Sequence, residues 1–112
     1  MRKIALLCSA FVVVAAAGQP AAQAPRASKT LDIYVADTEG GKAALYVTPS
    51  GQAVLVDAGN PGGRDHDRIL AMLKEAGVEK LDYLISTHYH VDHIGGLIEL
   101  AKKVPIAHFI DH

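Results

Sequence analysis

Short apolar runs separated by turn residues make up the chain from Leu31 onward. The ranges 31–35, 44–48 and 53–56 are rich in the β-branched, aromatic and other apolar residues that are typical of β-strands. Gly and Pro lie in the two gaps between these runs, at 39–41 and 49–51. This pattern predicts three strands that follow one another as a meander.

The spacing of apolar positions changes to a helical period after residue 64. Side chains that share one face of a helix recur every three or four positions. The apolar positions with this spacing are Ile69, Leu70, Leu73 and Ala76. Asp65 can cap the start of this helix, and Gly77 marks its end. We therefore predict an amphipathic helix packed on the sheet.

Two further strands and a second helix are predicted near the end of the chain. The ranges 83–86 and 106–110 are short and apolar, as strands are. The helical face between them is formed by Ile94, Leu97, Ile98 and Ala101. Lys102 and Lys103 follow, which suits a helix C-terminus. The order of three strands, helix, strand, helix and strand indicates the α/β fold class.

The first 17 residues form a separate segment, in which a basic start precedes an uncharged apolar run. The run ends in three alanines, which is typical of a secretory signal peptide. A membrane anchor is the alternative, but it needs about 20 apolar residues. We predict a signal peptide at 1–17 and a flexible lead at 18–30, rich in Ala, Gln and Pro. The protein is then expected to be secreted or periplasmic, with no membrane segment after cleavage.

Composition is that of an ordinary globular protein, with 50% hydrophobic and 21% charged residues and a net charge of −1. Because there is neither net positive charge nor a basic run with interleaved aromatics, no nucleic-acid partner is expected. A small-molecule substrate is expected instead, and the oligomeric state is not indicated. The single cysteine, Cys8, lies within the predicted signal peptide. Any metal site in the mature segment must therefore use nitrogen and oxygen ligands.

Histidine is the unusual residue, because three of the six histidines fall within positions 88–93. His88, His90, Asp92 and His93 follow a predicted strand and precede two glycines. Imidazole and carboxylate suit zinc, manganese or iron, and four such ligands exceed what one tetrahedral catalytic zinc takes from protein. Surface-loop histidines are the alternative, but the density of ligand types favours two metal ions. Adjacent Asp92 and His93 converge with the others only if the segment is a tight loop.

These residues carry a family resemblance. The string from His88 to Gly96 resembles the His-x-His-x-Asp-His signature of the metallo-β-lactamase superfamily. Residues 54–59 are similar to the strand and turn before the first helix of that superfamily. The range 31–59 further resembles its secreted hydrolase branch and the related domain of DNA-uptake competence proteins. The resemblance implies an αββα sandwich, of which residues 31–112 would be the N-terminal half, in a truncated chain.

The resemblance also assigns roles to individual residues. His88 and His90 would bind a first ion, and Asp92 and His93 a second, with Asp92 also the catalytic residue that orients the attacking water. Asp57 would orient a ligand histidine, although capping its own Ala-Gly bend is an equal alternative. The family's later ligands are a third histidine, a bridging aspartate and a final histidine, and none is assigned here. Three histidines are not expected to be ligands: His66, His108 and His112.

The implied function is hydrolysis of an ester, lactone, amide or phosphodiester bond by a metal-bound hydroxide. The cofactor would be two divalent ions, with zinc expected first and manganese or iron as alternatives. Two other functions stay open. One is an iron-dependent oxygenase on the same fold, although His90 stands where the flavin-linked branch carries glutamate. The other is a non-catalytic metal-binding scaffold. Residues 18–112 alone are expected to be inactive, because they supply only part of each ion's ligands.

Overall fold

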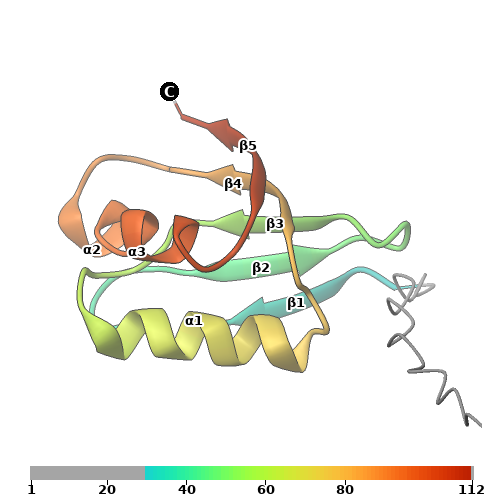
Figure 1. The fold of residues 1–112 in the computed structure, drawn as a ribbon, viewed down its shortest axis with the longest axis horizontal. Coiled ribbons are helices and arrows are strands. Elements are labelled where there is room, and N and C mark those ends of the chain that lie inside the picture. The colour runs from blue at the N-terminus through green and yellow to red at the C-terminus, as the bar shows by residue number, and fades with distance from the viewer. Residues whose placement is uncertain (1–29, 112) are drawn as a thin grey trace, which may run out of the picture.

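A computed structural model describes residues 30–111, and within them a five-stranded sheet with three helices (Figure 1). The predicted signal peptide, all but the last residue of the lead, and His112 lie outside the described residues. The strands are β1 Asp32–Val35, β2 Ala44–Val47, β3 Ala53–Val56, β4 Leu81–Ile85 and β5 Ile106–Ile110. The helices are α1 Gly63–Glu75, α2 Val91–Ile94 and α3 Leu97–Ala101. The predicted α/β class is confirmed.

The strands lie in the sheet in the same order as in the chain. β1, β2 and β3 pair antiparallel, as the predicted meander requires. β3, β4 and β5 pair parallel, because α1 and then α2 with α3 return the chain to the opposite edge. The carboxyl ends of the three parallel strands therefore meet at one edge of the sheet, which is where α/β proteins place their sites.

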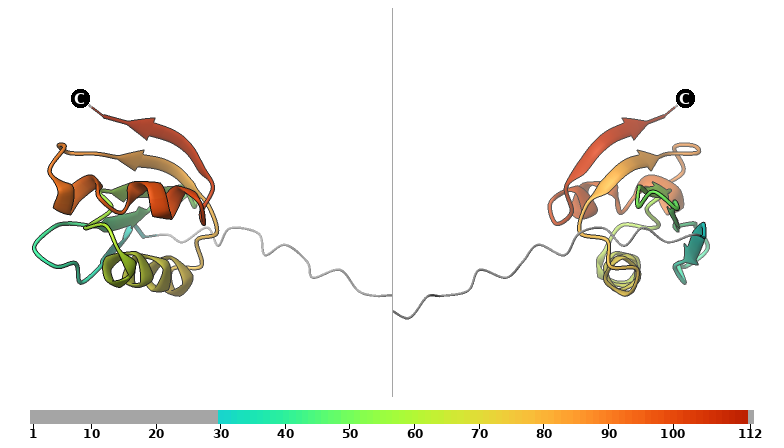
Figure 2. Two further views of the ribbon diagram at one scale, coloured as in Figure 1. Left: turned by 60° about the vertical axis from the view of Figure 1, so that its left-hand side comes forward. Right: turned by 90° about the vertical axis from the view of Figure 1, so that its right-hand side faces the viewer.

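One face of the sheet is packed against helices. Directly paired residues share a face, and the row Leu45, Leu55 and Leu84 is almost fully buried. These leucines belong to one core cluster with Ile69 and Leu73 of α1 and Leu100 of α3. Figure 2 shows the helices gathered on this side of the sheet.

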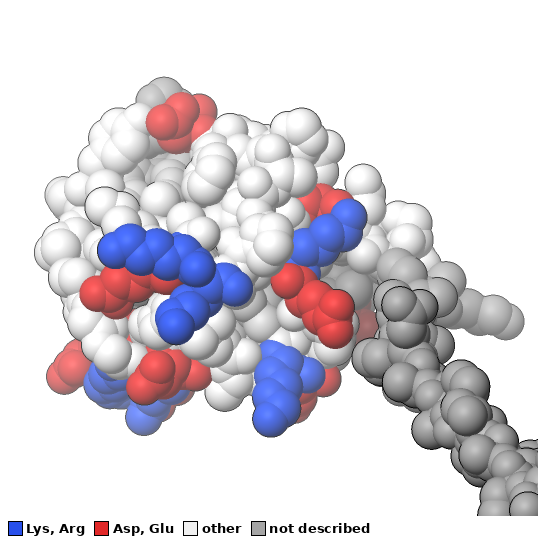
Figure 3. All heavy atoms as spheres, viewed as in Figure 1, with Lys and Arg blue, Asp and Glu red and all other residues white. Residues whose placement is uncertain are grey.

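The other face carries a row of partly or largely exposed side chains. It runs across all five strands through Ile33, Tyr46, Val54, Tyr83 and His108. From the opposite side, on which the helices lie in front of the sheet, Figure 3 shows charged side chains of both signs over the middle and lower part of the view and few charges in its upper part. Within residues 30–111, none of the helices has the length and apolar character needed to cross a bilayer.

The predicted capping role of Asp65 is wrong. α1 begins at Gly63, and Gly62 is its N-cap residue, without a side-chain cap. Asp65 instead lies inside the first turn, where it is 2% exposed and binds two loops beside the helix. The predicted end at Gly77 is confirmed, since Gly77 has a left-handed φ of 68° directly after the C-cap residue Ala76.

The second predicted helix is two short helices. The chain breaks at Gly95 and Gly96, because the Gly96 amide donates to Gly59 O at 3.1 Å and not into the helical ladder. The predicted face is also wrong in part, since Ile98 is 67% exposed and Leu100 is the residue that reaches the core. Lys102 follows α3 as its C-cap residue, as predicted.

Candidate metal centre

The histidine cluster lies at the carboxyl end of β4, beside the end of β3. Asp57 follows β3, and its amide donates to Ile85 O at the end of β4 at 2.8 Å. The prediction that all four residues of the cluster lie in one tight loop is wrong for two of them. His88 and His90 lie in the loop, whereas Asp92 and His93 lie in α2, whose first turn is closed by bonds from the His93 and Ile94 amides to His90 O.

The three imidazoles of the cluster contact one another. His88 Nε2 lies 3.1 Å from His90 Nδ1. The rings of His88 and His93 are tilted against each other, with centroids 4.0 Å apart. Asp92 Oδ2 lies 3.8 Å from His93 Nε2. The fold thus brings together the four residues that the sequence singled out.

Asp57 underlies this cluster as a fully buried carboxylate. Its oxygens accept hydrogen bonds from the Thr87 amide and the Thr87 hydroxyl, each at 2.8 Å, and its Oδ2 lies 2.8 Å from His93 Nδ1. These bonds lead away from the Ala58-Gly59 bend, so the side chain does not cap that bend. The backbone of Asp57 has a left-handed φ of 62°, which aspartate tolerates better than most residues.

The charge of Asp57 is stabilised despite its burial. Desolvation by itself raises the pKa of a buried carboxyl group. Hydrogen bonds from the Thr87 amide, His93 and the Thr87 hydroxyl, with the charge of His93, outweigh it and lower the pKa of Asp57. An ionised carboxylate only accepts hydrogen bonds, so His93 Nδ1 carries the proton. When His93 is neutral, as a metal ligand must be, its lone pair is therefore on Nε2, which lies 3.8 Å from Asp92 Oδ2.

Thr87 is the functional residue that the sequence reasoning missed. Its hydroxyl donates to Asp57, so it accepts from His88 Nδ1 at 3.0 Å. That bond places the proton of His88 on Nδ1 and leaves Nε2 with a lone pair facing His90. The position of Thr87, directly before the first histidine, was the available signal. A single hydroxyl has no spacing pattern by which to recognise it.

A hydrogen bond also joins the histidine loop to the residue that follows β5. Tyr89, between His88 and His90, is 58% exposed and donates to Asp111 Oδ2 at 3.1 Å. This bond to a carboxylate raises the pKa of Tyr89. Because Asp111 follows β5, the tyrosine connects the ligand loop to the end of the neighbouring parallel strand.

The other histidines have different surroundings. His108 lies on β5, where its ring stacks on Tyr83 with centroids 5.2 Å apart. His66 lies in α1, and among residues 30–111 its buried Nδ1 has no hydrogen-bond partner. Neither is brought to the cluster by the contacts described above, and His112 lies outside the described residues.

The donor chemistry of the cluster fits a divalent ion. Tetrahedral zinc with Zn–N distances of about 2.0–2.1 Å holds two ligand nitrogens about 3.3 Å apart, close to the 3.1 Å between His88 Nε2 and His90 Nδ1. Within residues 30–111 no three His, Asp or Glu side chains already surround one point with ligand geometry. The pair His88 and His90 is therefore the part of the site that is closest to ligand geometry.

The chain is similar to known proteins of one family. The model of the Metallo-beta-lactamase superfamily matches residues 37–112. A UPF0173 metal-dependent hydrolase of Koribacter versatilis is 40% identical over 60 residues, covering 51% of this chain and 22% of that protein. A coenzyme F420H(2) oxidase of Methanothermobacter marburgensis is 38% identical over 55 residues, covering 47% of this chain and 14% of that protein.

A solved structure has a similar fold over about two thirds of the chain. It is a HARLDQ-motif mutant of a metallo-beta-lactamase from Cronobacter sakazakii, with a TM-score of 0.54 and 26% sequence identity. The match covers 64% of this chain and 28% of that one. The five-stranded sheet with its helices thus corresponds to part of a larger fold, and the chain spans about a fifth of the first curated relative's length.

Proposed function

The chain belongs to the metallo-beta-lactamase superfamily, and from that membership we propose that it supplies the first metal ligands of a metal-dependent hydrolase. The observation that carries the proposal is the pair of ring nitrogens, His88 Nε2 and His90 Nδ1, 3.1 Å apart. A hydrolase is also the function named for several relatives, including the protein from Koribacter versatilis.

Each residue of the cluster has a distinct task in this proposal. His88 and His90 would hold one ion, and Asp92 and His93 a second. Asp57 and Thr87 keep the protons of His93 and His88 on Nδ1, so that each Nε2 has a lone pair to offer. Bound divalent ions, with zinc expected first, supply Lewis acidity and lower the pKa of a bound water.

Asp92 is proposed as the catalytic residue. Its side chain is 34% exposed, so it is reachable by water and by substrate, and it lies beside His93 Nε2. From there its carboxylate accepts a hydrogen bond from the attacking water and orients it. The proposed substrate is an ester, lactone, amide or phosphodiester, which all present a carbonyl or phosphoryl centre to that water.

One relative supports an alternative on the same fold. The protein from Methanothermobacter marburgensis is named as an oxidase, and histidine with carboxylate also suits non-haem iron. The alternative predicts that the purified protein contains iron and consumes oxygen. The hydrolase predicts zinc or manganese and no oxygen uptake.

The test uses the full-length gene product, with metal content and hydrolysis measured together. We expect about two ions per chain and turnover of at least one of a panel of chromogenic esters, lactones, β-lactams and phosphodiesters. His88→Ala and His93→Ala should each lose metal, and His66→Ala is the matched control that should keep it. Asp92→Asn should lower kcat by about 10²–10⁴-fold, whereas Tyr89→Phe should change it little.

Two results would contradict the proposal. Equal metal loss in His66→Ala would mean that the assigned ligands are wrong. A metal-loaded wild-type protein that is inactive on every substrate class would favour a scaffold that binds metal without catalysis.

A further inference from the structure

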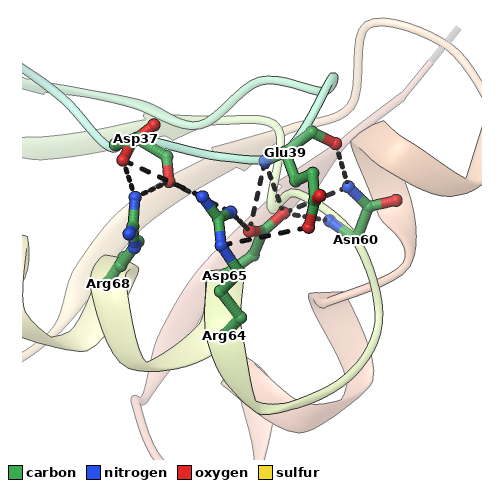
Figure 4. Close-up of polar contacts among 6 residues, drawn as sticks. All are labelled: Asp37, Glu39, Asn60, Arg64, Asp65 and Arg68. Atoms are coloured by element: carbon green, nitrogen blue, oxygen red, sulfur yellow. Dashed lines mark hydrogen bonds and ion pairs between the residues drawn. The ribbon is translucent and has the colours of Figure 1, made fainter.

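A second buried carboxylate, Asp65, lies on the far side of the loops that border the cluster. Figure 4 shows it between the β1–β2 loop and the loop before α1. Its oxygens accept from the Asn60 amide at 2.9 Å, the Asn60 side-chain amide at 3.1 Å and the Glu39 amide at 3.2 Å. Arg64 donates to it at 2.7 Å. Asp65 therefore joins these two loops to the first turn of α1 by hydrogen bonds.

Both loops reach the backbone of α2. In the first loop, the Lys42 amide donates to Asp92 O at 3.4 Å. In the second, the Ala58 amide donates to His93 O at 2.7 Å, and Gly59 O accepts from the Gly96 amide at 3.1 Å. The loops are also bonded to each other, by the Gly59 amide and Lys42 O at 3.0 Å. Asp65 is thus linked to Asp92 and His93 by a series of hydrogen bonds that are joined through the backbone of the two loops.

The backbone is closely packed at three glycines along this series. A Cβ atom on Gly41 would lie 1.7 Å from Asp92 O, and one on Gly96 would lie 2.2 Å from Ala58 O. At the other end, a Cβ on Gly59 would lie 2.9 Å from Asp65 Oδ2. Since backbone meets backbone at Asp92 of α2 and at Gly96 shortly after it, a displaced loop displaces the helix.

We propose that Asp65 is a positioning residue of the metal centre, which sets α2 and so Asp92 and His93 relative to the histidine loop. The inference rests on the proposed function in taking these two residues as ligands. The inference goes beyond that function because it assigns a role to Asp65, for which no contact with a ligand side chain is found among residues 30–111.

The effect should be unequal for the two ions. Asp92 and His93 lie on the helix that the series holds, whereas His88 lies in the loop before it and is held by Thr87. Loss of the hydrogen bonds of Asp65 should therefore lower the metal affinity of the site formed by Asp92 and His93 more than that of the site formed by His88 and His90.

The experiment is Asp65→Asn in the full-length protein, which preserves the volume of the side chain and removes its charge. Zinc titration at a temperature where the variant is folded should show the second equivalent weakened about tenfold, the size typical of residues behind a ligand. The first equivalent should stay within about threefold. In the metal-free protein, the Ala58 and Gly96 amides should exchange faster with solvent than in wild type.

Asp67→Asn is the matched control, because Asp67 is an exposed residue of the same helix, and it should leave both affinities and both amides unchanged. Asn60→Ala, which keeps the carboxylate, is the milder second variant in case Asp65→Asn does not fold. It should shift the second equivalent in the same direction.

A lower melting temperature with unchanged affinities and unchanged exchange would overturn the positioning role and leave the proposed function standing. If wild type bound no metal, the proposed function would fail, and amide exchange in the metal-free protein would still decide whether Asp65 positions α2.

Discussion

Asp57 and Asp65 are both almost fully buried, and both have a pKa below the ordinary value of a carboxyl group. They differ in the groups that they bind. Asp57 binds the side chains of Thr87 and His93. Asp65 binds the amides of Glu39 and Asn60, and a guanidinium. One carboxylate orients rings within the candidate site, and the other fixes the loops around it.

The difference lies in how each charge is compensated. Burial raises the pKa of a carboxyl group unless donors offset it. One donor to Asp65 is the guanidinium of Arg64, whose side chain is 44% exposed. Its positive charge partly neutralises the negative charge of the buried carboxylate. Within residues 30–111, the side chains that donate to Asp57 are those of Thr87 and His93, and neither is a guanidinium or an ammonium group. A change at Asp57 should therefore alter the proton positions of the ligand rings directly, and one at Asp65 only through the backbone.

Asp57→Asn should have the largest effect on the metal. Asparagine is tolerated at the left-handed φ of 62°, so the backbone is kept while the charge is lost. We expect metal affinity of the full-length protein to fall by about 10–100-fold, with both equivalents affected, because Thr87 and His88 are joined to the same carboxylate. Zinc titrations of Asp57→Asn and Asp65→Asn under the same conditions check this expectation. Equal or weaker loss than in Asp65→Asn would remove the distinction between the two carboxylates.

Thr87→Val should have an intermediate effect that sharpens the comparison within the Asp57 region. Valine has the shape of threonine without the hydroxyl that joins Asp57 to His88. We expect the first metal equivalent to weaken by about fivefold, which corresponds to the roughly 1 kcal/mol of one hydrogen bond. Thr87→Ser keeps the hydroxyl and should bind as wild type does. Nitrogen-15 NMR of the metal-free protein should show His88 losing its preference for the Nδ1 proton only in the valine variant.

The last effect concerns stability and not metal affinity, and its dependence on pH tests the charge of Asp65. A carboxyl group whose folded pKa lies below its unfolded value contributes stability above the unfolded pKa, and this is lost as the pH falls through the folded one. For Asp65 the unfolded reference is 3.8. The free energy of unfolding of wild type should exceed that of Asp65→Asn most near neutral pH, by about 1–3 kcal/mol, as measured by thermal denaturation at a series of pH values. The difference should narrow below pH 3.8, and a constant difference would show that the charge is not what stabilises the loops.

Local patterns in the sequence predict the strands, α1 and the end of α1 at Gly77 well. Each of these depends on the period of apolar positions or on a single turn residue, and neighbours in the chain determine both. The same patterns place the histidine cluster after β4, at the edge where the parallel strands end. The family resemblance leads to the expectation that Asp57 orients a ligand histidine, and in the structure its Oδ2 lies 2.8 Å from His93 Nδ1.

The features that sequence did not predict depend on contacts between distant segments. The Gly95-Gly96 break arises because Gly59 accepts the Gly96 amide, and Asp65 turns toward Glu39 and Asn60 because those amides meet it in space. Glu39 lies 26 positions from Asp65, so a local pattern of residues cannot reveal that contact. Gly41 is a further case, since nothing in its own sequence neighbourhood shows that Asp92 O lies where a Cβ would be.

The wide separation in the chain of the residues that meet at Asp57 has a kinetic consequence. Thr87 and His93 lie 30 and 36 positions from Asp57, so these bonds form only after β3 and β4 have come together across α1. Contacts of such long range are expected late in folding, and interactions absent from the transition state mainly slow unfolding. A bound ion should therefore lengthen the lifetime of the folded chain while leaving its rate of folding almost unchanged.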